Sequence, residues 1–345
     1  MLVNPLHHRP GPHLLVVGDL CPDIVVSGVA TRGRELAFGQ AEELVEATTL
    51  TMGGSAAITA SAAAAAGAAV ALVAVVGNDD LGRLCIGWLA DREVGTDQVR
   101  VADDVRTGSS VVLVRADDSS DRHILTELGG IAALTADEVT DVRLASAGHV
   151  HVASWFLLDG ARDGLPERLA AARTRGCTTS LDTNDDPAGA WTSAVAALPH
   201  CDVLFCNDRE ATGLAGTADP EAAAAQLLAL MPHRDADARF PAVVRKLGAE
   251  GARVVTARGT VSVEAPDVEV VDTVGAGDTL AGTVLAALVA GAEWPRALRL
   301  GVAAGSLSTT GSGGVQAQPD LRATQNLARD LEVSAHPRSE QENSP

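Results

Sequence analysis

Residues 268–280 have the sequence VEVVDTVGAGDTL, and the apolar run AGTVLAALVAGA follows them at 281–292. The β-branched residues at the start predict a strand, and the run rich in Leu, Ala and Val predicts a helix. Two glycines separated by Ala276 allow a tight turn between them, so N–H groups without helical partners converge where the helix begins. Because such a helix start attracts phosphate, the segment predicts an anion site.

One carboxylate, Asp278, follows this turn. Because a bound phosphate would repel it, we interpret Asp278 as a base that takes a proton from an attacking hydroxyl. The amides that would hold the developing negative charge are those of Gly275, Ala276 and Gly277. The alternative is that Asp278 caps the helix and that the glycines form an ordinary strand-to-helix turn. A dinucleotide-binding fingerprint fits poorly, since it needs a third glycine at Leu280.

The 345-residue chain is acidic, with a formal net charge of -19. Nucleic acids and anionic membranes bind basic faces, so we expect neither as a partner. A nucleotide would have to be held by backbone amides, a metal ion and a few cations, and Lys246 is the only lysine. The five cysteines are odd in number and form no CxxC pair, which argues against a disulfide framework or a zinc site and favours a reducing cytoplasm.

One uncharged stretch, residues 56–77, is long enough to cross a membrane. Alanine dominates it and Gly67 interrupts it, so we expect a buried helix, a turn and a buried strand instead. Residues 1–13 lack the long apolar region of a signal peptide.

Several glycine and acidic motifs, each near the end of an expected strand, resemble those of the PfkB (ribokinase-like) carbohydrate kinase family. Residues 272–278, DTVGAGD, resemble its second signature, D-T-x-G-A-G-D, and Gly53 and Gly54 open a segment similar to its first, G-G-x-x-x-N. The resemblance extends from about residue 14 to residue 319. It implies a kinase that transfers the γ-phosphoryl group of ATP to a hydroxyl group.

On the substrate side, the resemblance implies three binding residues. The segment from Gly18 to Asp23 is similar to the family's G-x-x-x-x-D pattern, in which the carboxylate accepts hydrogen bonds from substrate hydroxyls. The amides of Gly53 and Gly54 would contact the substrate at a helix start. Ile58 stands where the family has asparagine, and its side chain makes no hydrogen bonds. We therefore expect a less polar or differently oriented substrate.

Asn207 and Glu210 follow a buried apolar run and match the family's N-x-x-E motif. The resemblance implies that they order Mg²⁺ and phosphate through water, with Glu210 as the residue on the metal side. The alternative is a capping pair at a helix start, and the two roles are compatible.

The remaining nucleotide-side residues lie in other strand-end segments. Lys246, Gly248 and Gly251 belong to a strand-turn-strand segment that resembles the family's nucleotide side. Lys246 could reach the phosphates of ATP, or it could be an ordinary surface lysine. Asn184 and Thr273 complete the expected nucleotide-binding set.

Two further positions differ from the family pattern. Asp186 replaces an arginine, which removes a cation that could bind a carboxylate or phosphate. We therefore expect an uncharged acceptor rather than an acidic sugar or a sugar phosphate. Val302 stands where relatives often have asparagine beside the nucleotide base, so contacts there would be apolar. Whether a monovalent cation binds beside Asp272 is a question that the sequence leaves open.

The alternation of expected strands and helices, together with this resemblance, predicts an α/β fold of the ribokinase type, with a mostly parallel sheet, flanking helices and a small β lid. We expect one kinase domain over residues 14–332, with lid segments at about 23–52 and 97–127. Residues 1–13 and 333–345 are expected to be flexible tails. The lid is often a dimer surface in this family, so a homodimer through the lid is a further expectation.

These features predict a cytoplasmic, ATP- and Mg²⁺-dependent kinase that phosphorylates a small carbohydrate. A nucleoside kinase of the same family is the nearest alternative. A catalytically silent sugar- or nucleotide-binding homologue would explain the differences at Ile58, Asp186 and Val302, whereas the intact segment 275–278 argues against it.

Overall fold

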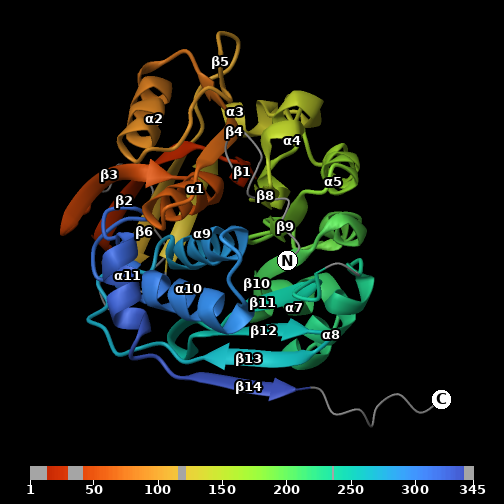
Figure 1. Ribbon diagram of the computed structural model, residues 1–345. Coiled ribbons are helices and arrows are strands. Elements are labelled where there is room, and N and C mark those ends of the chain that lie inside the picture. The colour runs from red at the N-terminus through yellow and green to blue at the C-terminus, as the bar shows by residue number, and fades with distance from the viewer. Residues whose placement is uncertain (1–13, 30–41, 116–121, 235–236, 338–345) are drawn as a thin grey trace.

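The computed structural model describes residues 14–29, 42–115, 122–234 and 237–337 (Figure 1). The expected tail residues 1–13 and 338–345, and the expected lid positions 30–41 and 116–121, lie outside the described residues.

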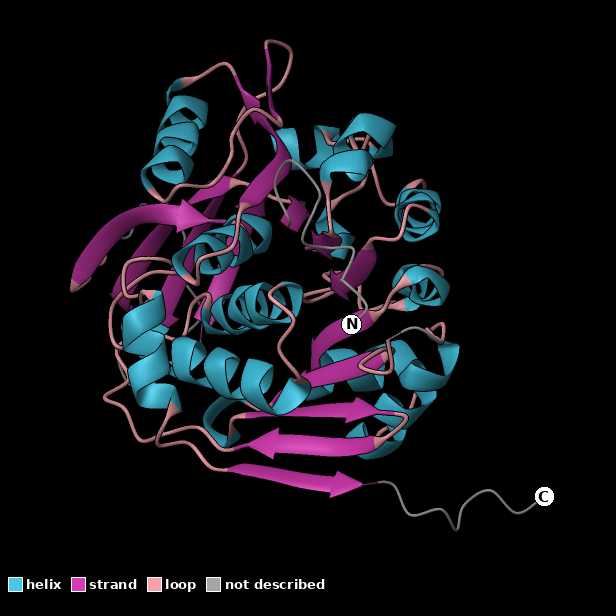
Figure 2. Cartoon of the chain, in the orientation of Figure 1, coloured by secondary structure: helices cyan, strands magenta, loops and turns pink. Residues whose placement is uncertain are grey.

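A ten-stranded sheet forms the centre of the molecule, and helices cover both of its faces (Figures 1 and 2). In sheet order the strands are β14 (Val333–Pro337), β13 (Gly259–Val263), β12 (Ala252–Thr256), β11 (Ala242–Lys246), β10 (Val203–Asn207), β9 (Thr178–Asp182), β8 (His149–Ala153), β1 (Leu14–Val17), β4 (Val70–Gly77) and β5 (Val99–Ala102). Neighbouring strands from β11 to β5 are parallel, whereas the pairs from β11 to β14 are antiparallel. The predicted mostly parallel α/β sheet is confirmed.

Successive side chains of the central strands point to opposite faces of the sheet, so the core consists of two layers. The helices are α1 (Ser55–Ala65), α2 (Asp80–Asp91), α3 (Gly130–Ala133), α4 (Asp141–Ser146), α5 (Leu165–Thr174), α6 (Thr192–Val195), α7 (Asp208–Ala215), α8 (Pro220–Leu230), α9 (Ala276–Val289), α10 (Trp294–Ser308) and α11 (Leu321–Ala328). On β1, Leu14 and Val16 belong to the layer that contains α1, α9 and α10. Leu15 and Val17 belong to the layer that contains α5, α7 and α8. Each fully buried Leu or Val stabilises the fold by about 2 kcal/mol.

A second sheet of four strands forms the lid, at the left of Figure 1. Its strands, in order, are β3 (Ala47–Gly53), β2 (Cys21–Val29), β6 (Ser109–Arg115) and β7 (Arg122–Glu127). Val25, Val112 and Val114 of the lid form an apolar cluster with Val274. The lid is therefore packed against the glycine-rich turn that precedes α9.

Two predicted boundaries are wrong. The lid segment expected at 97–127 starts too early, because β5 pairs with β4 at the edge of the central sheet. The flexible tail expected from residue 333 also starts too early, because β14 pairs along its full length with β13. In both cases a short strand is fixed by a neighbour that is distant in sequence, and local patterns do not reveal such a neighbour.

The strand expected at the start of segment 268–280 is also absent, because residues 264–270 form no regular element. No described strand pairs with this segment. Instead, the amides of Val271 and Asp272 both donate to the carbonyl of Thr309, at 2.8 and 3.1 Å. The segment is therefore attached to the end of α10.

The uncharged stretch at 56–77 forms most of α1, a turn, and β4, as predicted. Ala56 to Ala63 are buried along α1, and all of β4 is buried. Across the described ranges, no helix combines the length and the apolar character that crossing a membrane requires.

Candidate active site

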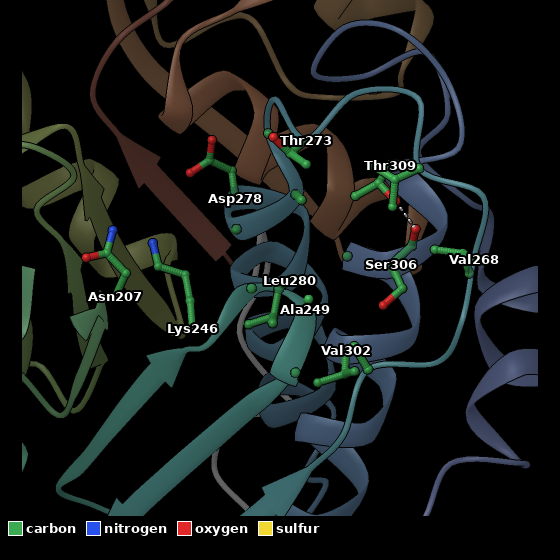
Figure 3. Close-up of a pocket in the computed structure, with 18 of the residues that line it drawn as sticks. Asn207, Lys246, Ala249, Val268, Thr273, Asp278, Leu280, Val302, Ser306 and Thr309 are labelled. Carbon is green, nitrogen blue, oxygen red and sulfur yellow. Dashed lines mark hydrogen bonds between the residues drawn. The ribbon is translucent and has the colours of Figure 1, made fainter. Parts of the chain in front are cut away.

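A cavity of about 540 Å³ lies where the carboxyl ends of β10 and β11 meet the start of α9 (Figure 3). Ligands of parallel α/β sheets bind at this edge because the loops that follow the strands diverge there. Most of the predicted site residues line the cavity, namely Asn184, Asn207, Glu210, Lys246, Gly248, Gly251, Thr273, Gly275, Ala276, Gly277 and Asp278.

The glycine-rich turn exposes two of the three expected amides. Gly275 has a φ of 72°, a left-handed conformation that favours glycine, and a Cβ there would lie 2.8 Å from the carbonyl oxygen of Gly314. The amide of Ala276 donates to the carbonyl of Thr273 at 3.3 Å. No described oxygen accepts a hydrogen bond from the amides of Gly275 or Gly277. The available anion hole is thus smaller than predicted, since Ala276 already has a partner.

Asp278 lies in the first turn of α9, and Figure 3 shows its carboxylate pointing into the cavity, across from Lys246 and Asn207. It is not a helix cap, because the N-cap residue of α9 is Gly275 and no side chain caps this helix. Burial raises the pKa of Asp278 to about 7; the negative charge of Asp182 adds to the rise and the ammonium of Lys246 opposes it. A base with such a pKa is well matched to proton transfer near neutral pH.

Lys246 is held over the turn by acidic neighbours. Its Nζ lies 2.7 Å from Oδ2 of Asp182 and 4.0 Å from Oε2 of Glu210, and its side chain is only 12% exposed. Burial opposes protonation, but the charges of Asp182, Glu210 and Asp278 raise the pKa of Lys246. The surface-lysine alternative is therefore wrong. Asp182 was not among the predicted site residues, although its place as the last residue of a buried strand could have indicated it.

Asn207 and Glu210 form a capping box at the start of α7. The backbone N–H of Asn207 donates to Oε2 of Glu210, and the side-chain Nδ2 of Asn207 donates to Oε1, both at 2.8 Å. Within the described chain, no group of three Asp, Glu, His or Cys side chains is arranged to hold a metal directly. Contacts made through water of a hydrated Mg²⁺ fit this donor set, because Mg²⁺ keeps several of its own waters.

Asp23, Gly53 and Gly54 do not line the cavity, but they lie together beside the start of α1. A Cβ at Gly53 would lie 2.0 Å from Oδ1 of Asp23, and one at Gly54 would lie 2.7 Å from the carbonyl oxygen of Asp19. Burial and the nearby charge of Asp19 raise the pKa of Asp23 to about 7. A residue with a side chain could therefore not replace Gly53, which the carboxylate of Asp23 approaches, or Gly54, which the backbone of Asp19 approaches.

Asp19, which the sequence analysis missed, anchors this region. Its carboxylate accepts hydrogen bonds from the amides of Ser55, at 3.1 Å, and Ala56, at 2.9 Å. Asn184 adds a second link, since its Nδ2 donates to the Ser55 hydroxyl at 2.9 Å. The start of α1 is therefore held between the ends of β1 and β9, next to Asp278.

The sequence matches the pfkB family carbohydrate kinase profile over residues 12–321. The chain belongs to the PfkB family. It is accordingly a carbohydrate kinase, a phosphotransferase whose acceptor is an alcohol group. An ATP-dependent ribose-1-phosphate kinase of Halopiger xanaduensis is 31% identical over 303 residues, which cover 86% of this chain and 92% of that protein.

Other relatives agree with this assignment. A 2-dehydro-3-deoxygluconokinase of Thermoproteus tenax is 31% identical over 75% of this chain and 80% of its own length. An Arabidopsis thaliana ribokinase, solved with ribose and ATP, superposes with a TM-score of 0.76 at 24% identity, over 92% of this chain and 99% of that chain. An Escherichia coli protein described as a ribokinase II, solved with ATP and Mg²⁺, has a TM-score of 0.79 at 22% identity, with the same coverage. The structural matches establish the ribokinase-like fold.

Two departures of this kinase from the family pattern have structural roles. Ile58 is buried beneath the glycine-rich turn, where its Cγ2 would lie 3.1 Å from a Cβ on Gly275. The carboxylate of Asp186 accepts hydrogen bonds from three amides of its own loop, at 2.7 to 2.9 Å. Although burial acts in the opposite direction, these bonds lower the pKa of Asp186. Asp186 does not line the cavity, so its replacement of arginine is no evidence for an uncharged acceptor.

The third departure, Val302, lines the cavity with other apolar groups. Figure 3 places it beside Leu280, with Ala249 and Val268 on the same cavity. This part of the cavity is apolar, and a purine ring prefers such an environment.

Proposed function

We propose that this PfkB kinase transfers the γ-phosphoryl group of ATP to a hydroxyl group of a small sugar, with Asp278 as the general base. The carboxylate of Asp278 would take the hydroxyl proton as the hydroxyl oxygen attacks the γ-phosphorus. The bond from that phosphorus to the oxygen of the departing ADP would then break. The observation that carries this proposal is the buried carboxylate of Asp278 facing the cavity one residue after the free amide of Gly277.

The charge that develops in this step would be held by groups already in place. The free amides of Gly275 and Gly277 and the partial positive charge of the α9 start would stabilise the transferring phosphoryl group. Lys246 would contact the ATP phosphates from the opposite wall. The remaining nucleotide-side residues in this proposal are Asn184, Asn207, Gly248, Gly251 and Thr273.

On the acceptor side, we propose that Asp23 and the amides of Gly53 and Gly54 bind substrate hydroxyls. Asp23 is buried, and its carboxylate is close to the start of α1, where Asp278 is also located. A carboxylate that accepts hydrogen bonds from two hydroxyl groups of the sugar would orient a third hydroxyl group for attack on the γ-phosphorus.

Mg²⁺ would be held through water by Asn207 and Glu210, and when bound it would neutralise charge on the phosphates. We also propose a monovalent cation beside Asp272. Asp272 is buried, with 6% of the residue exposed. Its carboxylate accepts hydrogen bonds from the amides of Val274 and Gly313 at 2.9 and 2.7 Å, and it forms no ion pair with a described residue.

The proposed setting is the cytoplasm, with ATP and a sugar as ligands and with no nucleic acid or membrane partner. The formal net charge of -19 supports both exclusions. A homodimer through the outer face of the lid is part of this proposal. Two half-exposed side chains on that face, Leu50 and Leu125, support it.

The decisive experiment compares the wild-type protein with Asp278→Asn in ATP turnover assays against sugars, sugar phosphates and nucleosides. We expect Asp278→Asn to lower kcat about a hundredfold or more while the Kd for ATP stays nearly unchanged. Equal turnover by both proteins would remove Asp278 from the mechanism. Turnover by the wild type with nucleosides alone would replace the sugar by a nucleoside as the acceptor.

A further inference from the structure

Arg122 lies on the inner face of the lid, the face that covers the site. In the antiparallel pair of β6 and β7 it is directly opposite Val114. Residues directly opposite each other project on the same side of a sheet. Val114 is buried in the cluster with Val274, which belongs to the glycine-rich turn. The side chain of Arg122 therefore projects toward that turn, and it lines the cavity.

The guanidinium of Arg122 forms a hydrogen bond with a neutral group. Its Nη1 donates to the hydroxyl of Thr273 at 3.1 Å, and it forms no ion pair with a carboxylate of the described chain. The other cation that lines the cavity, Lys246, is already neutralised by Asp182. Because the Thr273 hydroxyl is neutral, no described residue balances the charge of Arg122, and its guanidinium can bind a ligand anion.

The inner face of the lid carries carboxylate and hydroxyl groups at one end and a cation at the other. At one end lie Asp23, Ser110 and Thr126, in register on three neighbouring strands, with the two hydroxyls 3.1 Å apart. Arg122 is at the other end of the same face. The charge of Arg122 lowers the pKa of Asp23, against the stronger effect of burial, so the two groups interact across the acceptor site. The positive charge of Arg122 would thus act on an acceptor whose hydroxyl groups are bound by Asp23.

We propose that Arg122 binds a phosphate or carboxylate group carried by the sugar, so that the acceptor of this kinase is an anionic sugar. The inference rests on the proposed function, and it replaces the uncharged acceptor that Asp186 suggested. A guanidinium presents a planar set of donors that matches a phosphate or a carboxylate. A neutral sugar would offer the guanidinium of Arg122 no anionic group of its own.

The test measures kcat and KM, with ATP as donor, for matched acceptor pairs: ribose and ribose 1-phosphate, fructose and fructose 6-phosphate, glucose and gluconate. We expect the wild type to prefer the anionic member of at least one pair by about tenfold or more in kcat/KM. Arg122→Gln should lower that preference by about tenfold or more, mainly through KM, and Arg122→Lys should keep part of it. His123→Gln, at the next position of β7 and on the opposite face, should behave like the wild type.

Three results would overturn the inference. They are a preference for the neutral sugar in every pair, an equal loss for both members of a pair in Arg122→Gln, and a rise in the KM for ATP as large as the rise for the acceptor. The last result would assign Arg122 to the nucleotide.

If the wild type phosphorylates none of these acceptors, the proposed function fails, and binding decides the inference separately. Ribose 1-phosphate, fructose 6-phosphate or gluconate should then raise the unfolding midpoint of the wild type but not that of Arg122→Gln. An anionic panel that leaves the wild-type midpoint unchanged overturns the inference.

Discussion

Lys246 and Asp182 form an ion pair that bridges the end of β10, with 2.7 Å between Nζ and Oδ2. Lys246 ends β11 and Asp182 ends β9, and these strands flank β10 on its two sides. The pair is nearly inaccessible to solvent, with side chains 12% and 1% exposed. Strand order therefore places the lysine ammonium next to Gly277, where it faces the cavity with Asp278 (Figure 3).

This geometry predicts that Lys246→Met damages both stability and catalysis. Without the ammonium, Asp182 becomes a buried charge with no cationic partner among the described residues, and we expect the free energy of unfolding to fall by about 3 kcal/mol. The loss of the charged hydrogen bond that we propose between Lys246 and the phosphates should lower kcat/KM for ATP by about tenfold or more. Urea unfolding and initial-rate kinetics at varied ATP concentration measure the two effects.

Two further variants separate these effects. Adding Asp182→Asn to Lys246→Met removes the unpaired charge, so stability should recover in part while kcat/KM for ATP should not. Arg83→Met breaks the exposed ion pair between Arg83 and Asp80, and it should change stability by less than about 1 kcal/mol. A Lys246→Met protein that unfolds at the wild-type urea concentration would contradict the assigned role of the pair.

The pKa values of the two site carboxylates predict a pH dependence of activity. Asp278 must be ionised to accept a proton, and Asp23 must be ionised to accept hydrogen bonds from hydroxyls. Because burial raises the pKa of both to about 7, kcat/KM for the acceptor should rise between pH 6 and 8 with a midpoint near 7. A profile that is flat over this interval would show that neither group titrates in the free enzyme.

The same carboxylates predict that the fold loses stability as the pH rises. A carboxylate whose pKa is raised by folding contributes stability that is fully present below its unfolded pKa, about 4, and is lost as the pH rises through its folded pKa, about 7. Asp278→Asn cannot ionise, so it should be more stable than the wild type at pH 8 and differ less at pH 5. Equal differences at the two pH values in urea unfolding would contradict this linkage.

Sequence reasoning located the cavity well because its residues follow strands. Asn207, Lys246 and Asp278 are far apart in the chain, yet the carboxyl ends of parallel strands and the starts of the following helices meet at one edge of the sheet. Motifs that are recognised one at a time in the sequence therefore line the same cavity, and the parallel sheet alone predicts this.

Residues whose roles depend on a distant partner were missed. Asp182 matters because of Lys246, 64 positions away, and Arg122 because strand pairing turns it toward Thr273, 151 positions away. The expectation about the acceptor that was based on Asp186 lacks structural support for the same reason, since the three amides that hold its carboxylate are not visible in a pattern of residue types. Strand pairing and side-chain contacts decide such cases, and local propensity carries neither.

Gly277→Ala tests whether the turn must leave room for Lys246. A Cβ at residue 277 would lie 3.1 Å from Cδ of Lys246 and 3.5 Å from its Nζ. The flexible lysine can move away, so stability should change by less than about 1 kcal/mol, while displacement of the ammonium should lower kcat/KM for ATP by about tenfold. The matched control is Gly87→Ala in α2, an exposed helical site where an added Cβ meets nothing within 4 Å. That variant should gain about 0.5 to 1 kcal/mol in urea unfolding and keep wild-type kinetics. Wild-type kcat/KM in Gly277→Ala would mean that the position of Lys246 above the turn is not needed for phosphoryl transfer.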